Sequence, residues 1–172
     1  EDYQRNRILA PYDPSIDPTN QGINWQPHQA KIAIASGGLT GTGLGEGTQS
    51  QSNAIPGKHT DFIFAVIGEE LGLIGACLVI LLLMIIVIRC VQIGLRSGNT
   101  MSMLVCFGVA STVVFQTFEN IGMCIGIAPV VGITLPFFSY GGSSLFSMFA
   151  AMGLVSGIKY RPKPTRAAIY GR

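Results

Sequence analysis

The sequence has few charged residues. Lys, Arg, Asp and Glu make up 12% of its 172 residues, about half the usual share of a soluble globular domain. Acidic residues are almost missing after Glu70, since eight of the nine lie at or before that residue and the ninth is Glu119. A soluble core of this size needs a polar surface that these residues cannot supply. The shortage excludes an ordinary soluble domain and indicates a polar first third followed by a membrane domain.

Cysteine is scarce, and its pattern indicates neither a metal site nor a disulfide framework. All four cysteines lie in or beside apolar runs, at spacings that fit no metal-ligand motif. The chain also opens on Glu1-Asp2-Tyr3 and has no basic and then apolar leader, so no signal peptide is expected. Together with the missing initiator methionine, this start indicates the C-terminal portion of a longer protein.

Long apolar segments are what the sequence does have. Residues 71–88 are eighteen consecutive residues without a polar side chain, about 27 Å of helix, which is enough to cross a bilayer. Two further apolar segments follow, and Pro129 and Lys159 end them. We therefore predict an all-α integral membrane protein. Its membrane domain covers residues 61–158, with transmembrane helices at about 62–96, 101–127 and 140–158.

Basic residues set the expected orientation. The loop 89–100 and the tail 159–172 carry bases and no acid, as the positive-inside rule expects of cytoplasmic segments. The tail could also bind nucleic acid, but beside an apolar span a topology signal next to membrane lipid is favoured. Residues 1–60 then form a large extracellular or periplasmic loop. Within it, residues 1–27 are expected to be extended, and a short helix is expected from His28 to Ala35.

A glycine-rich segment (residues 36–47) holds six glycines in twelve residues. Such backbone can turn tightly and present N–H groups, so one interpretation is a cradle for phosphate. It is not a nucleotide-binding P-loop, because no Gly-Lys-Ser/Thr follows. The alternative interpretation is a flexible loop over the membrane surface.

Acidic residues near the first span are the main candidates for chemistry. Asp61 falls in the first turn of the expected helix, where a carboxylate either caps the helix or, if Thr60 caps it, stays free for another task. Lys58 and His59 beside it complete a mixed-charge cluster at the outer membrane surface. Of Glu69 and Glu70, at most one shares the Asp61 face, and either could be an interfacial residue that reaches water.

Two more features could form a site inside the membrane domain. Glu119 lies within the second apolar segment, where an ionisable group marks a cavity, a pair or a pathway. Residues 135–144 contain a proline and a Gly-Gly pair, so the third helix should start late or be broken here. Irregular backbone at this depth must be buried or line a wet cavity. The hydroxyls of Ser139, Ser143 and Ser144 would suit a phosphate or sugar there, although helix packing through small residues explains the same pattern.

Three motifs, in order and spacing over nearly the whole chain, resemble the SEDS (shape, elongation, division, sporulation) family of bacterial membrane proteins. They are residues 36–39, residues 59–72 with His-Thr-Asp-Phe and Glu-Glu-Leu-Gly, and residues 136–144 with Pro-Phe-Phe-Ser-Tyr-Gly-Gly-Ser-Ser. Residues 118–123 look more like the rod-shape (RodA) branch than the division branch (FtsW). Members have about ten spans of about 20 residues, so this chain would hold the last three.

The resemblance implies a peptidoglycan glycosyltransferase of the bacterial cytoplasmic membrane, active in cell elongation and shape. It would polymerise lipid II, the undecaprenyl-pyrophosphate disaccharide-pentapeptide, by an inverting transfer, with Asp61 as the catalytic residue. The isolated chain is expected to be inactive. A divalent cation, magnesium or manganese, is a candidate cofactor. Expected partners are a class B penicillin-binding protein and other elongation proteins. Candidate substrate-binding residues are Lys58, His59, Thr60, Glu70, Glu119, Ser139, Ser143 and Ser144.

Two other functions fit the same sequence. A transporter or flippase of a lipid-linked cell-wall precursor would also use Glu119, a broken third helix and glycine motifs. A non-catalytic membrane scaffold for cell-wall enzymes would need no reactive acid at all. An assay in detergent separates the glycosyltransferase from the flippase, because polymerisation needs no sealed compartments and flipping does.

Overall fold

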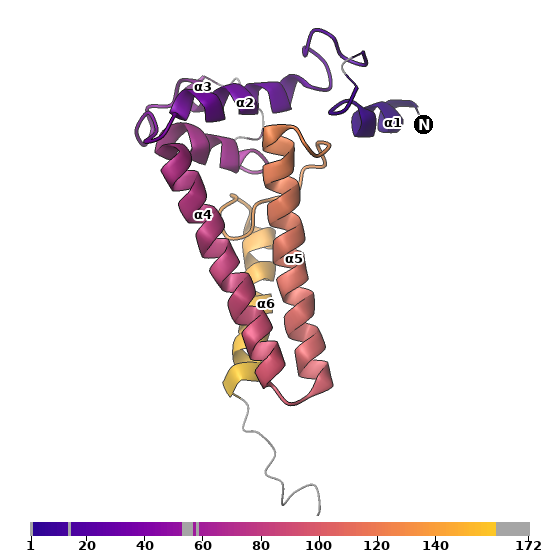
Figure 1. The fold of residues 1–172 in the computed structure, drawn as a ribbon, viewed down its shortest axis with the longest axis vertical. Helices are drawn as coiled ribbons and strands as arrows, with labels where there is room; N and C mark the ends of the chain where they lie inside the picture. The colour runs from indigo at the N-terminus through magenta and orange to yellow at the C-terminus, as the bar shows by residue number, and fades with distance from the viewer. Residues whose placement is uncertain (1, 14, 53–56, 58, 161–172) are drawn as a thin grey trace, which may run out of the picture.

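The computed structural model describes residues 2–13, 15–52, 57 and 59–160, and this part of the chain forms helices without any strand (Figure 1). Three long helices stand side by side, and the shorter helices lie across one end of them. The helices are α1 (Asp2–Leu9), α2 (Trp25–Gly37), α3 (Thr48–Gln51), α4 (Ile63–Arg96), α5 (Thr100–Ile125) and α6 (Gly142–Tyr160).

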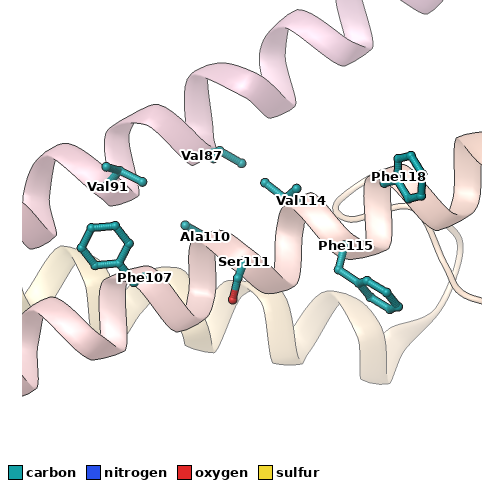
Figure 2. A pocket seen from close by; sticks show the side chains of 8 residues that line it. All are labelled: Val87, Val91, Phe107, Ala110, Ser111, Val114, Phe115 and Phe118. Carbon is teal, nitrogen blue, oxygen red and sulfur yellow. The ribbon is translucent and has the colours of Figure 1, made fainter.

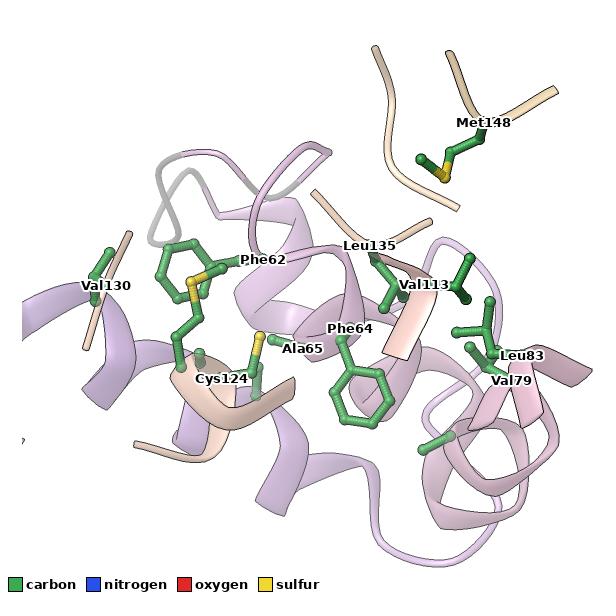
Figure 3. Packing of buried hydrophobic residues seen from close by; sticks show 14 residues of the cluster. Phe62, Phe64, Ala65, Val79, Leu83, Val113, Cys124, Val130, Leu135 and Met148 are labelled. Atoms are coloured by element: carbon green, nitrogen blue, oxygen red, sulfur yellow. The ribbon is translucent and has the colours of Figure 1, made fainter. Parts of the chain in front are cut away.

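Two of the long helices, α4 and α5, are largely apolar. α4 and α5 are each long and apolar enough to cross a membrane. Where they face each other they bury Val79, Leu83 and Val113, and α6 adds Met148 to the same cluster (Figure 3). Large apolar side chains elsewhere on α4 and α5 stay exposed, among them Leu78, Leu81, Phe115 and Phe118. A helix that is apolar all round is typical of a membrane span.

An open apolar groove of about 460 Å³ runs along α4 and α5 (Figure 2). Its single polar side chain, Ser111, already donates its hydroxyl hydrogen to the carbonyl of Gly108 at 2.9 Å. The groove therefore offers an apolar wall and suits an acyl chain or an apolar helix. It is lined by Val87, Val91, Phe107, Ala110, Ser111, Val114, Phe115 and Phe118.

The first 27 residues are more ordered than the sequence suggested. α1 precedes the prolines, and α2 begins at Trp25 and includes Pro27 in its first turn, where a missing N–H is tolerated. The Tyr12 hydroxyl donates to the carbonyl of Ile127 at 2.7 Å, which ties the end of α1 to the loop after α5. The expectation of an extended segment was wrong, because such long-range contacts are not visible in local composition.

Helix α4 is broken at Gly72, whose backbone has φ 66° and ψ −165°. A break leaves carbonyls before it and N–H groups after it without partners in the helix. The glycine-rich segment (residues 36–47) supplies both. The carbonyls of Glu69 and Glu70 accept from the N–H groups of residues 42 and 43, at 3.0 and 3.1 Å. The N–H groups of residues 73 and 74 donate to the carbonyls of residues 38 and 39, at 3.0 and 3.2 Å.

Glycine is required at this junction because backbone meets backbone. A Cβ atom at Gly37, Gly41 or Gly72 would lie within 3.0 Å of backbone atoms of the opposite segment. The segment is therefore fixed to α4, and its N–H groups at residues 41–43 donate within the protein. Neither interpretation of this segment, the phosphate cradle or the flexible loop, describes its structure.

Candidate active site

Asp61 lies in a turn before α4. The helix begins at Ile63, and its N-cap residue, Phe62, makes no side-chain capping bond. The Thr60 hydroxyl donates to the carbonyl of Gly57 at 3.3 Å and does not cap the helix either. The expected position in the first helical turn was wrong. Asp61 is half-buried, and within the described part of the chain no group donates a hydrogen bond to its carboxylate.

Three donors hold the backbone under this carboxylate. The carbonyls of three consecutive residues, His59, Thr60 and Asp61, each accept one hydrogen bond from a distant part of the chain. The donors are the backbone N–H of Tyr140 at 2.8 Å, the hydroxyl of Ser139 at 2.6 Å and the side-chain amide of Asn120 at 2.7 Å. We call this arrangement the carbonyl clamp. It fixes the direction of the chain at Asp61 from α5 and from the loop before α6.

Asn120 is the central residue of the carbonyl clamp. It is fully buried on α5, and its Nδ2 atom also donates to the carbonyl of Ile133 at 2.7 Å. Because both amide hydrogens are used, the orientation of the side chain is fixed. Its Oδ1 atom is buried without a hydrogen-bond partner among the described residues. Asn120 therefore joins Asp61 to the loop between α5 and α6.

Glycines border the Asp61 carboxylate. A Cβ atom at Gly132, where φ is 79°, would lie 3.3 Å from Oδ2 of Asp61. A Cβ atom at Gly57 would lie 4.0 Å from the same oxygen. The loop after α5 thus passes close to the carboxylate at a residue that has no side chain. The sequence motifs did not include Gly132 or Gly57, and only their three-dimensional position identifies them.

Ser143 and Ser144 line an open polar pocket of about 300 Å³ between α5 and α6. The hydroxyls of Thr134 and Ser144 are hydrogen-bonded to each other at 2.9 Å. Gln116 also lines this pocket, and its Oε1 atom is buried without a partner within the described ranges. Thr134 follows Ile133, which Asn120 holds, so the same loop borders this pocket and Asp61. The remaining lining residues are Ser147 and Met148.

The acids on α4 hold the loop beside them. The Glu69 carboxylate is fully buried and accepts from the N–H groups of Gln49 and Ser50, both at 2.8 Å. It thereby pairs free N–H groups at the start of α3, so Glu69 is not the exposed interfacial residue that the sequence suggested. The half-buried Glu70 accepts from the Ser50 hydroxyl at 3.1 Å. No contact joins Glu70 to Asp61 in the part of the chain that the structure describes.

The other predicted residues are placed as follows. The His59 side chain is exposed. Ser139 is buried, and its hydroxyl accepts from the backbone of Leu135 and donates to Thr60. It has a structural role, since no donor hydrogen remains for a substrate. Glu119 is buried on α5, with no hydrogen bond or ion pair to another described residue. Lys58 lies outside the described residues.

Metal ligands are few at this site. Among the described residues there is no group of three or more His, Cys, Asp or Glu side chains that could hold a metal ion. The side chains around Asp61 do not form a carboxylate-rich set of the kind that Mg²⁺ or Mn²⁺ binds in proteins. The cation considered from the sequence therefore has no ligand set in this part of the chain.

Replacing Asn120 by aspartate tests the carbonyl clamp. The change substitutes an acceptor for the amide donor and leaves two part-buried carbonyls without this partner, so we expect the free energy of unfolding to fall by about 2 kcal/mol. The thermal transition of the purified protein in detergent measures this loss. Asn99→Asp is the matched control: Asn99 caps α5 as an acceptor from Met101 N, and aspartate caps equally well. Equal stability of the two variants would contradict the role of Asn120.

Nearly the whole chain is similar to known proteins. A family model described as "Cell cycle protein", FTSW_RODA_SPOVE, matches residues 1–163. The chain is 45% identical over 157 residues to a protein of Escherichia coli K12 named "Peptidoglycan glycosyltransferase MrdB", covering 91% of this chain and 42% of the relative. It is 42% identical over 164 residues to the "Probable peptidoglycan glycosyltransferase FtsW" of Geobacter metallireducens, covering 95% and 43%.

A solved structure agrees with these sequence matches. A chain of the structure named "Structural coordination of polymerization and crosslinking by a peptidoglycan synthase complex" superposes with a TM-score of 0.69 at 32% identity. The match covers 94% of this chain and 44% of that chain. The present chain thus spans less than half the length of the relatives it matches.

Proposed function

Because the chain belongs to the FtsW, RodA and SpoVE family of cell cycle proteins, we propose that the full-length protein is a peptidoglycan glycosyltransferase that polymerises lipid II. The observation that carries this proposal is the half-buried Asp61 carboxylate, whose backbone is held by the carbonyl clamp. An inverting transfer to a sugar hydroxyl needs a positioned carboxylate that can take the hydroxyl proton.

Asp61 acts as the general base in this mechanism. An inverting transfer from an α-linked pyrophosphate donor needs one displacement, in which the acceptor 4-hydroxyl attacks the anomeric carbon. The carboxylate takes the hydroxyl proton as the new bond forms, which requires hydrogen-bond reach of the oxygen. The pyrophosphate leaves with the electron pair of the broken bond, so no second carboxyl acid is required if its charge is stabilised.

The rigid backbone at Asp61 serves this chemistry. General-base catalysis depends on a heavy-atom distance held near 3 Å, and a shift of about 1 Å is costly. The carbonyl clamp uses donors from three separate places to hold residues 59–61. Asn120 and Ser139 are therefore positioning residues, whereas Asp61 is the residue proposed to touch the substrate. The pocket lined by Ser143 and Ser144 is a candidate for further substrate contacts.

We further propose that α6 is a third span beside α4 and α5. It has 19 residues, about 28 Å of helix, close to the thickness of the hydrocarbon core. The turn between α4 and α5 and the end of α6 lie at one end of the long helices, opposite α2 and α3 (Figure 1). Arg89, Arg96 and Lys159 are near that end, which supports a cytoplasmic location for it. Asp61 then lies on the outer side.

The partner we propose is a class B penicillin-binding protein. The superposed structure is named as a peptidoglycan synthase complex, which supports an assembly of this kind. The apolar groove along α4 and α5 (Figure 2) offers a surface for a membrane helix of such a partner. Cell elongation is the proposed process, since residues 118–123 resemble the rod-shape branch.

Turnover in detergent tests the proposed function. The purified full-length protein, with its penicillin-binding partner, is mixed with lipid II in detergent micelles, and the products are separated by size. We expect glycan strands longer than the disaccharide unit. A flippase would give no product under these conditions, because it needs sealed compartments to act. Failure to form strands in micelles, with lipid movement across vesicles, would replace the glycosyltransferase by the flippase.

A further inference from the structure

A second polar pocket lies on the outer part of the molecule, and Asp61 is not among the residues that line it. It is open, has a volume of about 340 Å³, and is formed by α1, the segment before α2, the first residues of α2 and the loop after α5. Neither the sequence motifs nor the site around Asp61 include its walls. The lining residues are Arg7, Gln21, Gly22, Ile23, Trp25, Gln26 and Val130.

Hydrogen bonds fix the walls of this outer pocket to one another. Oδ2 of Asp17 accepts from the N–H groups of Gly22 and Asn24, both at 3.0 Å, which holds the segment before α2. The Asn24 side chain donates to the carbonyl of Ala10 at 3.1 Å, at the end of α1. The Tyr12 hydroxyl reaches the loop after α5. The three walls are therefore one connected structure.

Asp17 keeps this connection at neutral pH. The pKa of the Asp17 carboxyl is lowered below its ordinary value, mainly by the hydrogen bond from the backbone N–H of Asn24. A carboxyl whose pKa is lowered by folding stabilises the folded state above its unfolded pKa, and this stabilisation is lost as the pH falls through the folded pKa. The segment before α2 thus stays held throughout the physiological range.

The lining residues have the chemistry to bind a saccharide that carries an acidic substituent. The Trp25 side chain is 39% exposed, and an indole face packs on the C–H face of a sugar ring while its N–H can still donate. Gln21 and Gln26 bring amide groups that can both donate to and accept from sugar hydroxyls and acetamido groups. Arg7 brings a planar guanidinium that pairs with a carboxylate. No acidic residue lines the pocket; the Asp17 carboxylate beside Gly22 accepts from the N–H groups of Gly22 and Asn24.

The outer pocket and Asp61 border the same short loop. Val130 lines the pocket, and Gly132, two residues later, lies beside the Asp61 carboxylate. Two residues of extended chain span at most about 7 Å. Val130 also packs in one hydrophobic cluster with Phe62, the residue after Asp61 (Figure 3). One glycan strand could therefore place one sugar in the pocket and a nearby sugar at Asp61.

We propose that the outer pocket binds the glycan strand near the reacting sugar, with Trp25 against a sugar ring and Arg7 paired with the carboxylate of the peptide-bearing substituent. This inference rests on the proposed function and names the substrate segment that the site recognises. Holding the strand between successive additions keeps the enzyme on one chain, so the pocket controls the length of the product.

Strand length tests the outer pocket in the active, full-length protein. The double change Arg7→Ala with Trp25→Ala removes the ion pair and the stacking surface, so we expect KM to rise about tenfold while kcat changes less than about twofold. The mean strand length should fall severalfold. Arg5→Ala is the matched control, since Arg5 is exposed on the same helix and does not line the pocket. The single variant Trp25→Phe keeps Arg7 and an aromatic face, so it should retain most of the wild-type strand length.

A direct binding measurement separates this inference from the proposed function. The Asp61→Asn protein is titrated with a lipid-free tetrasaccharide that carries stem peptides, followed by ligand-observed NMR. We expect binding that the Arg7 and Trp25 changes weaken about tenfold and that Arg5→Ala leaves unchanged. Binding without turnover by the wild-type protein would support the pocket and refute the glycosyltransferase. If the Arg7 and Trp25 variant makes strands of normal length and binds the tetrasaccharide as tightly as the protein without these changes, the inference about the pocket is wrong and the proposed function stands.

Discussion

Replacing Asp61 by asparagine is expected to lower the rate of lipid II polymerisation by roughly 10²- to 10⁴-fold, the usual contribution of a general base. Asparagine keeps the shape of the side chain and the Asp61 carbonyl that Asn120 holds. It cannot accept the proton of the acceptor hydroxyl. The rate of strand formation by the purified full-length variant in detergent measures the loss. Since no described residue donates a hydrogen bond to the carboxylate, folding should not depend on its charge.

Glu46→Gln is the matched control for this change. Glu46 is an exposed acid on the same outer part of the chain, and the same loss of one negative charge there should leave the rate unchanged. Asp61→Asn should also retain its thermal transition within about 1 °C, because a surface substitution changes stability by less than about 0.5 kcal/mol. An active Asp61→Asn protein would remove Asp61 from the mechanism.

Replacing Gly72 by alanine is expected to have the largest effect on stability. An alanine held at the φ of 66° and ψ of −165° of this residue is strained by about 1–3 kcal/mol. Its Cβ would also lie 2.6 Å from the carbonyl oxygen of Leu39, and forcing extra atoms into a packed site adds about 1–3 kcal/mol. Loss of the monodisperse protein on heating in detergent measures the effect.

Gly38→Ala separates strain from collision. Gly38 also has a positive φ, of 54°, but a Cβ there meets nothing within 4 Å. The alanine variant should therefore lose only the contribution of backbone strain and remain clearly more stable than Gly72→Ala. If the two variants lose monodisperse protein at the same temperature, the close approach of the glycine-rich segment to α4 does not contribute to stability.

Local sequence was a good guide to the positions of the helices, and it singled out Asp61 as a candidate for chemistry. An uninterrupted apolar run and a Ser-Gly-Asn turn predict α4 and the start of α5, where Asn99 caps the helix and Gly98 takes a positive φ. Asp61 stands out because it is a charged residue beside an apolar run. These features depend on neighbours within a few residues, which is the range that periodicity and capping rules cover.

Contacts between distant residues could not be predicted in the same way. The donors of the carbonyl clamp, Asn120 and Ser139, are 59 and 79 residues from the carbonyls they hold. Composition suggested a loose or phosphate-binding glycine-rich segment, yet its glycines serve close backbone packing on α4. The sequence allowed either Glu69 or Glu70 to be an interfacial acid, but Glu69 is fully buried, and its carboxylate accepts from two N–H groups of α3. Local patterns carry no information on which segments meet.

The most direct test of the central claim is the distance between the Asp61 carboxylate and the acceptor hydroxyl. It can be measured in a structure of the full-length protein, with Asp61→Asn to prevent turnover, bound to lipid II. We expect the side-chain oxygen or nitrogen of residue 61 within about 2.6–3.2 Å of the sugar 4-hydroxyl, directly or through one water. A bound acceptor whose 4-hydroxyl faces another residue, with residue 61 beyond the reach of one water, would contradict the role of Asp61 as the base.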